Sequence, residues 1–374
     1  MSIYDVLSRL FPTRPAPENP RRIVLIQPCC IGDVVLATAA LAALRRAYPA
    51  AFITWAVGSW SKGVIEAHPM VDAVMDTGPE ALPVYSPRSL WRFAANLRAG
   101  RFDLAVSLVR SPLMSAAVLL AGIPHRAGLD SAGRGFGYNL RVPVDPHAPR
   151  HEAEIYLDVA RALGLDVSGC RATIPTRESD RDYVRALLDE QDIGAPYIVL
   201  SPAGGRNPGM VMDTKRWPPH HLAVLADRLA ARLAARVVLV GGPDDDLLLA
   251  AVAEIMQSPA LRLAGKLSFG QIAALAAGAR LYVGSDTGLT HLAAAAGAPT
   301  VMILGPSDPA RYAPFADSAV ALWKPVPVSR SGVAGGAPKD WDWARDGIGV
   351  DEAEARILAF LENAAPGYKP KNIG

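Results

Sequence analysis

The feature that most constrains the fold is a strand–loop–helix–strand pattern near the start of the chain. Residues 22–27 read RIVLIQ, a run typical of a buried strand. A polar loop over 28–33 follows, then a helix over about 34–48 and a second strand over 51–57. Strand, short loop, helix and strand in this order make the βαβ unit of a parallel sheet. The pattern therefore predicts an α/β fold.

A similar pattern restarts in the second half of the chain. The strands there end in loops rich in Gly, Pro, Ser and Asp, and ligands of open α/β sheets bind outside the carboxyl ends of the strands. Because 374 residues exceed the usual size of a single core, we predict two α/β domains with a hinge at 165–180. The strands expected in the second half are 197–201, 236–240, 279–283 and 300–304.

Three further segments fall outside this repeating pattern. Residues 325–347 are rich in Pro, Gly, Ser and charge and predict an exposed loop, and residues 350–363 predict a closing amphipathic helix. The first twelve residues lack a secretory leader, and no apolar run reaches the roughly 18–20 residues that span a bilayer. Residues 1–12 suit a short helix that either packs on the rest of the protein or lies at a membrane interface. Its apolar face would hold Ile3, Val6, Leu7, Leu10 and Phe11.

Charge is nearly balanced overall but uneven along the chain. A formal net charge of +2 gives no support for nucleic-acid binding. Residues 88–150 hold nine arginines against three acids, which is usual for a solvated face but also suits an acidic partner such as a phosphorylated glycolipid. The arginines are Arg88, Arg92, Arg98, Arg101, Arg110, Arg126, Arg134, Arg141 and Arg150.

Cysteine and histidine usage predicts neither disulfides nor a metal site. Cys29, Cys30 and Cys170 form no C-x-x-C motif and no disulfide framework, which fits a reducing cytoplasm. His147 and His151 are four residues apart, but Pro146 and Pro149 disfavour a helix through both, and no acidic cluster completes a site. We therefore expect no structural metal.

The segment 284–297 places polar residues where an expected strand becomes an Ala-rich helix. Free backbone N–H groups and the positive end of a helix attract anions, so Asp286, Thr287 and His291 are candidates for holding a phosphate or diphosphate. Ser, Asp and Thr are equally preferred as ordinary helix N-caps. Both interpretations are open on this segment alone.

Other candidate residues follow other strands. Asp33 would emerge at the sheet edge, either as a helix cap or as a general base. Gly204 and Gly205 would let a ligand approach the backbone closely, and Lys215 suits a diphosphate, although a lone lysine is usually a surface residue. Asp244, next to Asp245, suits ribose hydroxyls or a helix cap.

Taken together, these motifs resemble those of glycosyltransferase family 9, the ADP-heptose:lipopolysaccharide heptosyltransferases. The resemblance extends over nearly the whole chain, and its pieces occur in the family's order. A weaker match is HEAEIYL at 151–157. The main matching stretches are IQPCCIGDVVL (26–36), PAGG (202–205) followed by KRWP (215–218), VGGPD (240–244), LAGKLS (263–268), VGSDTGLTH (283–291) and ILGP (303–306).

The resemblance implies a GT-B fold, in which two Rossmann-like domains face each other across a cleft. On this basis residues 1–175 form an acceptor domain and residues 181–345 a nucleotide-sugar donor domain. A C-terminal helix, 350–374, is expected to cross back onto the first domain. The resemblance also implies inverting transfer without a metal or other cofactor, the nucleotide-sugar being a co-substrate.

The resemblance further implies a role for each candidate residue. Asp33 would take the proton from the acceptor hydroxyl, while Lys215 and the helix start at Thr287 and Gly288 would stabilise the departing nucleoside diphosphate. Asp286 would hold the sugar, with His291 lining the same pocket. The expected donor site comprises Gly204, Gly205, Lys215, Asp244 at the ribose, Leu267 at the base, Asp286, Thr287, Gly288, Leu289 and His291.

The implied function is transfer of a sugar, with heptose from ADP-heptose as the leading candidate, to a saccharide or glycolipid such as lipopolysaccharide core. Two departures leave the donor and acceptor open. The loop Ala203-Gly204-Gly205 lacks hydroxyl residues and is followed by an apparent insertion at 207–212, and the loop 325–347 has no match in the family. A nucleotide-sugar epimerase and a non-catalytic binding protein are alternatives, and Asp33 argues against the latter. The expected location is cytoplasmic, with peripheral contact at the inner membrane left open.

Overall fold

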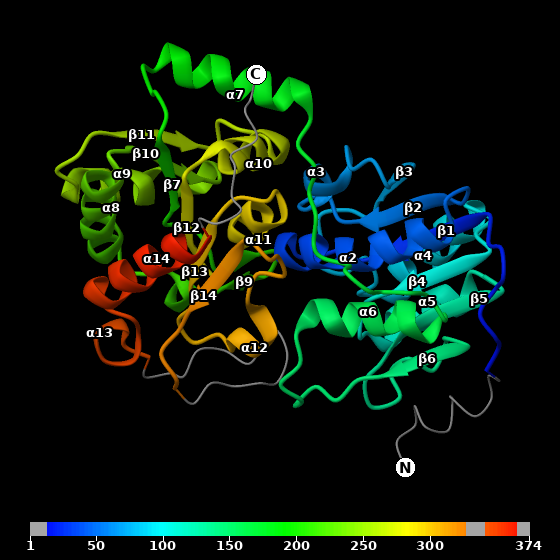
Figure 1. The fold of residues 1–374 in the computed structure, drawn as a ribbon. Helices are drawn as coiled ribbons and strands as arrows, with labels where there is room; N and C mark the ends of the chain where they lie inside the picture. Colours follow the sequence, from blue (N-terminus) through cyan, green and yellow to red (C-terminus); the bar gives the residue numbers. More distant parts are fainter. Residues whose placement is uncertain (1–12, 327–340, 365–374) are drawn as a thin grey trace. The chain divides into compact units, whose positions relative to one another are not determined.

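The computed structural model describes residues 13–326 and 341–364 (Figure 1). The expected helical face of residues 1–12 lies outside these ranges, as do residues 327–340 of the expected loop and residues 365–374. The chain divides into two compact units. The first contains residues up to 172 together with 207–209, and the second contains 173–206 and the residues from 210 onwards. The division falls inside the polar segment 165–180.

The first unit is built on a six-stranded parallel sheet. Its strand order is β3-β2-β1-β4-β5-β6, in which the order reverses between β1 and β4, as in a Rossmann fold. The strands are β1 (Arg22–Ile26), β2 (Phe52–Val57), β3 (Ala73–Asp76), β4 (Leu104–Ser107), β5 (His125–Asp130) and β6 (Leu140–Pro143). The helices are α2 (Ile31–Ala47), α3 (Lys62–Ile65), α4 (Pro87–Ala99), α5 (Pro112–Leu120) and α6 (Glu152–Ala162).

Apolar residues of this sheet are buried by helices on both of its sides (Figure 1). Val24 and Ile26 of β1 are fully buried in one core with Phe93 of α4 and Met114 of α5. Helix α2, with ten buried residues, packs along α6. A central strand covered on both faces must be apolar throughout, which is why residues 23–26 form an uninterrupted hydrophobic run.

The second unit repeats this topology. Its six-stranded parallel sheet has the order β11-β10-β7-β12-β13-β14, reversing between β7 and β12. The strands are β7 (Tyr197–Ser201), β10 (Arg236–Gly241), β11 (Ala260–Ala264), β12 (Leu281–Ser285), β13 (Thr300–Ile303) and β14 (Ala319–Leu322), and a separate pair is formed by β8 (Arg206–Asn207) and β9 (Met210–Val211). The helices are α7 (Glu178–Glu190), α8 (Pro219–Leu233), α9 (Asp246–Ile255), α10 (Phe269–Gly278), α11 (Gly288–Ala295), α12 (Pro309–Tyr312), α13 (Trp343–Asp346) and α14 (Val350–Ala364), with 3-10 turns η1 (Asp213–Lys215) and η2 (Pro243–Asp245).

Two helix layers cover this second sheet. Helices α8 and α9 pack on one another, as do α7 and α10. Helix α14 packs on α8 and β14, and its residues Ala353, Ile357 and Leu361 belong to the same core as α8 and α9. Over residues 350–364 this helix therefore packs on the second unit. The implied crossing of a helix over 350–374 onto the first domain stays a prediction.

The end of the 325–347 segment differs from the predicted exposed loop. Residues 343–346 form the short helix α13, begun by Asp342, whose side chain accepts a hydrogen bond from the Ala344 N–H. The indole N–H of Trp343 donates to the Thr214 carbonyl at 3.0 Å. This part of the segment is therefore packed against the residue that precedes Lys215.

Across residues 13–326 and 341–364, no helix combines the length and apolarity needed to cross a bilayer.

Candidate functional site

In each unit, polar side chains gather where the strand order reverses. Asp33 follows β1 and Arg110 follows β4, and these two strands are neighbours in the first sheet. In the second unit the loop with Gly204 follows β7, and Asp286 follows the neighbouring strand β12. Parallel strands that diverge at a reversal leave a crevice at their carboxyl ends, which is where ligands of open α/β sheets bind.

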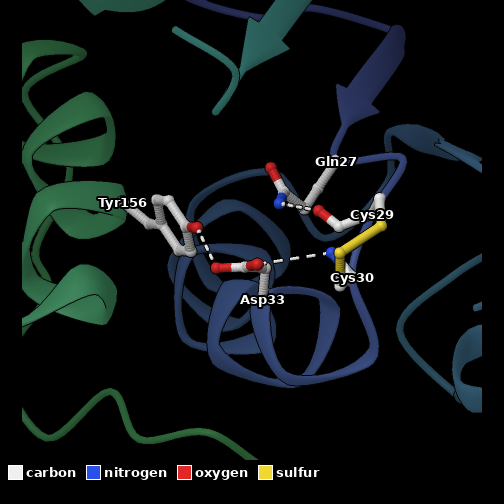
Figure 2. Close-up of a disulfide and its surroundings, with 5 residues drawn as sticks. All are labelled: Gln27, Cys29, Cys30, Asp33 and Tyr156. Atoms are coloured by element: carbon white, nitrogen blue, oxygen red, sulfur yellow. Dashed lines mark hydrogen bonds between the residues drawn. A yellow bond between two sulfur atoms is a disulfide. The ribbon is translucent and has the colours of Figure 1, made fainter. Parts of the chain in front are cut away.

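Asp33 lies in the first turn of α2, because this helix begins at Ile31, three residues earlier than predicted. It is therefore not the N-cap, which is Cys30. Its Oδ2 accepts a hydrogen bond from the Cys30 N–H at 3.3 Å, and its Oδ1 accepts one from the Tyr156 hydroxyl at 2.8 Å (Figure 2). Each carboxylate oxygen thus has a donor on a different element, which fixes the orientation of the group.

A buried ion pair lies beside Asp33. Arg110 holds Glu152 through two hydrogen bonds, of 2.5 and 3.4 Å, and only 2% of the Glu152 side chain is exposed. Glu152 and Tyr156 are four residues apart on α6 and so project from the same helix face. The sequence matched the 151–157 stretch to a family motif but gave no role to these two residues. The available signal was their spacing of four residues within a helix expected over 152–163.

The surroundings of Asp33 make it a better proton acceptor near neutral pH. Burial and the adjacent Glu152 carboxylate raise the pKa of Asp33 from 3.8 to about 6, against the hydrogen bonds from Tyr156 and Cys30 and the charge of Arg110. Burial and the Asp33 charge raise the pKa of Tyr156 well above 10, so its hydroxyl stays protonated and donates. A carboxylate with these properties can act as a general base.

The turn before α2 corrects one expectation. Cys29 and Cys30 form a disulfide, whereas the sequence predicted none, and Cys170 is a buried free thiol (Figure 2). The disulfide joins two adjacent residues. It therefore does not link distant segments of the chain, which is the kind of disulfide framework that the cysteine spacing argued against. The Gln27 side-chain amide donates to the Cys29 carbonyl at 2.7 Å and holds the same turn.

In the second unit, two glycines allow the loop after β7 to lie close to its neighbours. Gly204 has a φ of +140°, and a Cβ built there would lie 2.2 Å from Cγ2 of Thr287. Gly205 has a φ of +71°, and its Cβ would lie 2.1 Å from the Met212 carbonyl oxygen. Both the positive φ and the lack of room for a Cβ require glycine at these positions. The sequence predicted that a ligand would approach this loop closely, and the structure shows that the start of α11 does so.

Lys215 is not a lone surface lysine. Its ammonium lies 2.7 Å from Oδ2 of Asp286, which also accepts a hydrogen bond from the Ser307 hydroxyl at 2.5 Å. Burial by itself raises the pKa of Asp286, but Lys215 and His291 outweigh it, and the pKa is lowered overall. The 7% exposed Asp286 side chain is thus a charged partner that positions the ammonium of Lys215, which is 20% exposed.

Thr287 is the N-cap of α11, as one of the two open interpretations held. Its hydroxyl accepts from the Thr290 N–H at 3.3 Å, while the Thr290 hydroxyl donates to the Ser285 carbonyl at 2.8 Å. Capping does not exclude anion binding, since the positive end of the helix dipole remains at Gly288. Leu289 and His291 are buried in the body of this helix.

Further residues hold the Lys215 segment in place, and the sequence did not identify them. Arg216 donates to the Gly204 carbonyl at 2.7 Å and pairs with Asp213 at 2.8 Å. The aromatic ring of Tyr312 has its centroid 5.4 Å from the Lys215 ammonium. Tyr312 comes from a segment far along the chain, so spacing alone could not reveal its contact with Lys215.

Asp244 and Leu267 lie further along the same sheet edge. Asp244 is exposed in the turn after β10, where the neighbouring Asp245 accepts from the Gly242 N–H at 2.9 Å, so the helix-cap interpretation fits Asp245. Leu267 lies half-buried between β11 and α10 and packs on a core of the unit. The strand order places the loop of Asp244 next to that of Gly204, and the loop of Leu267 beyond it.

Comparison with known proteins identifies the family. The family model for glycosyltransferase family 9 (heptosyltransferase) matches residues 90–333, well over half of the chain. The chain belongs to glycosyltransferase family 9. Lipopolysaccharide heptosyltransferase 2 of Escherichia coli (strain K12) is 30% identical over 305 residues, which cover 77% of this chain and 84% of that relative. The predicted resemblance is confirmed, and the protein is a glycosyltransferase.

Solved structures confirm the predicted fold class of this family 9 chain. The glycosyl transferase family 9 protein from Veillonella parvula DSM 2008 superposes with a TM-score of 0.76 at 24% identity, over 93% of this chain and 99% of that one. Escherichia coli ADP-heptose lps heptosyltransferase II gives a TM-score of 0.71 at 23% identity, over 92% and 99%. With two Rossmann-type sheets of identical order, the fold is GT-B.

The nine arginines of residues 88–150 differ in their exposure and in their partners in this family 9 protein. Arg98, Arg126 and Arg141 donate to backbone carbonyls within the unit, and Arg110 and Arg150 pair with acids. Six of the nine are exposed: Arg88, Arg92, Arg98, Arg101, Arg134 and Arg150. Among residues 13–326 and 341–364, no three His, Cys, Asp or Glu side chains are grouped to hold a metal ion.

Proposed function

We propose that this enzyme transfers a heptose from ADP-heptose to a hydroxyl group of a lipopolysaccharide core acceptor, with inversion at the anomeric carbon. The observation that carries the proposal is the environment of Asp33, a carboxylate at the strand reversal of the first unit whose pKa is raised to about 6. The choice of sugar and acceptor is supported by the relatives, among them a lipopolysaccharide heptosyltransferase 2 and an ADP-heptose lps heptosyltransferase.

The second unit supplies the donor site in this proposal. The diphosphate would lie at the start of α11, between Gly204 and the Lys215 ammonium, because free N–H groups and a lysine both favour its charge. In the transition state, negative charge grows on the departing diphosphate, and a fixed cation there stabilises it. We propose that Lys215 and the helix start do this without a metal ion, and that no other cofactor takes part.

The strand order supports one orientation of the donor. Along the carboxyl edge the loops follow one another in the order β12, β7, β10 and β11. A nucleotide-sugar with its diphosphate at β12 and β7 would place its ribose near Asp244 and its base near Leu267. The sugar would then lie at the other end, by Asp286 and His291, with Asp286 already held in place by Lys215 and Ser307.

The first unit supplies the base. Inverting transfer is a single displacement, in which the acceptor oxygen forms a bond to the anomeric carbon as the bond to the diphosphate breaks. The acceptor hydroxyl must lose its proton during this step, and we propose that Asp33 takes it. The exposed arginines of this unit suit an anionic glycolipid, which would bring the enzyme to the cytoplasmic face of the inner membrane.

Mass spectrometry of the reaction product tests this function. The purified enzyme is incubated with ADP-heptose and with lipopolysaccharide cores truncated at successive sugars, and with UDP-, GDP- and dTDP-sugars in parallel. The proposal expects one heptose to be added to a single truncated core, with ADP released in equal amount. Transfer from another nucleotide-sugar alone would overturn the donor assignment, and free sugar released without any acceptor would favour the epimerase alternative.

A further inference from the structure

The side chains around Asp33 form a chain of contacts that the transfer reaction itself does not account for. Tyr156 donates to one oxygen of Asp33, while Glu152, one helical turn earlier on α6, lies beside them and is held by Arg110. Tyr156 and Glu152 are 3% and 1% exposed, so both are fixed by packing. Burying a charged pair and a phenol costs free energy, and a solvated carboxylate on α2 would need neither.

We propose that Tyr156 and Glu152 are positioning residues, which hold the Asp33 carboxylate in one orientation and set how strongly it holds a proton. This inference rests on the proposed role of Asp33 as the base. Figure 2 shows the geometry that carries it, with the Tyr156 hydroxyl directed at one carboxylate oxygen and the Cys30 N–H at the other. Neither residue need touch the substrate.

The two residues act on Asp33 in opposite directions. The Tyr156 hydroxyl stabilises the charged carboxylate by donating to it, whereas the negative charge of Glu152 opposes a second negative charge nearby. Arg110 offsets part of the Glu152 charge and locks its position through two hydrogen bonds. The groups that face Asp33 are therefore Tyr156 and Glu152 from α6, Arg110 from the loop after β4, and the Cys30 N–H.

Because Tyr156 and Glu152 affect Asp33 in opposite directions, variants of the two should shift the pH profile of the enzyme in opposite directions. A loss of packing would not produce opposite shifts. In Tyr156→Phe the donor is lost, so the acid limb of the pH profile of kcat/KM moves upward, by about one unit. In Glu152→Gln a negative charge is lost while one hydrogen bond from Arg110, to the amide oxygen, can persist, so the same limb moves downward, by about half a unit. A purely structural role would lower the rate of both variants without moving the two midpoints apart.

Each variant has a matched control in the same unit. Tyr138→Phe removes another buried hydroxyl, which donates to Ser107 at 2.8 Å. Glu154→Gln neutralises another acid on α6, which pairs with Arg161 at 2.6 Å. Both controls are expected to keep the wild-type midpoint. If neither Tyr156→Phe nor Glu152→Gln moves the midpoint relative to its control, or if both move it the same way, the inference is wrong.

A direct titration separates this inference from the proposed function. The 13C carboxyl signal of Asp33 in the full chain is assigned as the signal lost in Asp33→Asn and is followed with pH. The inference expects this signal to titrate higher in Tyr156→Phe and lower in Glu152→Gln, whatever the effect on transfer. If the titrations shift as expected but Asp33→Asn still transfers heptose, only the assignment of Asp33 as the base is wrong. If the titrations do not shift, only the positioning role of Tyr156 and Glu152 is wrong.

Discussion

The Lys215 ammonium lies 2.7 Å from the carboxylate of Asp286 in the second unit, and this contact joins two residues that were predicted separately for a donor site. Asp286 is buried and has a lowered pKa, so it carries a charge that needs its partner. A buried ion pair that loses one member is strongly destabilised, because the remaining charge stays uncompensated. If Lys215 holds the donor as proposed, we expect the pair to couple donor binding to the stability of this unit.

Lys215→Met is expected to destabilise the protein by about 3 kcal/mol and to abolish donor binding. Adding Asp286→Asn removes the unpaired charge, so the double variant should regain most of the stability while still failing to bind the nucleotide-sugar. Urea unfolding and calorimetric titration with ADP-heptose measure the two effects. Lys62→Met, in an exposed pair with Asp76 at 3.9 Å, is the control and should cost less than about 1 kcal/mol. Donor binding regained by the double variant would contradict the role of Lys215.

Gly204→Ala is expected to weaken donor binding through the start of α11. The new methyl group would meet Cγ2 of Thr287, which must move and take the helix cap with it. Gly209→Ala is the control, because Gly209 also has a positive φ, of +75°, but has nothing within 4 Å of a Cβ. Its cost is limited to the backbone, about 1 kcal/mol.

Thr287→Ser makes the Gly204 experiment specific. Serine keeps the capping hydroxyl but lacks the methyl group that the alanine would meet. The double variant Gly204→Ala with Thr287→Ser should therefore recover part of the stability and donor affinity lost in Gly204→Ala, measured by the same unfolding and titration experiments. No recovery would mean that the φ of +140°, and not the contact with Thr287, imposes glycine at this position.

Asp33→Asn is expected to change the pH dependence of stability in a defined direction. The pKa of Asp33 is about 6 in the folded protein against 3.8 for the free group, so between these values the folded state binds more protons and its stability falls as pH rises. The Asp33→Asn variant has no carboxyl group to titrate at this position, so it does not lose stability in this way as pH rises. Its stability relative to wild type should increase from pH 4 to pH 7 by up to about 3 kcal/mol, measured by urea unfolding at each pH.

Asp72→Asn provides a comparison of opposite sign. Burial alone raises the pKa of Asp72, but the Ile53 N–H and Arg45 lower it overall. Its charged form therefore stabilises the fold above its unfolded pKa, and Asp72→Asn should lose stability relative to wild type as pH rises from acid. The same slope for Asp33→Asn and Asp72→Asn would show that the raised pKa of Asp33 is incorrect.

Thiol titration checks the correction at the start of α2. With Cys29 and Cys30 joined and Cys170 free, the unfolded, unreduced protein should react with one equivalent of a thiol reagent, and with three after reduction. Cys170→Ser should lower the first count to zero. Three equivalents without reduction would mean that the two adjacent cysteines are thiols, as the sequence predicted.

The central strands could be predicted from the sequence because a strand buried on both faces must be apolar along its length. Strand β7 begins and ends where it was expected, and all five of its residues are buried. Strands β5, β6, β11 and β14 were not predicted, since each is only partly buried and is therefore not required to be apolar along its length. Helix α2 was predicted to begin three residues late, because its first turn is capped by a cysteine and a following aspartate that no common cap pattern includes.

Some residues of the candidate site could likewise be predicted from the sequence, whereas others could not. Asp33, Gly204 and Asp286 follow central strands, so their place at a sheet edge could be derived from topology. Tyr156 and Ser307 reach these residues from segments more than twenty positions away, and only tertiary packing shows which of them make contact. The sequence could thus locate these candidate residues but not the side chains that hold them.

The most direct test of the central claim compares Asp33→Asn with wild type in donor binding and in transfer. If Asp33 is the base, the variant binds ADP-heptose with a dissociation constant close to that of wild type, because the donor loops lie in the second unit. Its rate of heptose transfer to a truncated lipopolysaccharide core falls by about 100-fold to 10,000-fold, the range expected when a general base is lost. Transfer by Asp33→Asn at the wild-type rate would contradict the account.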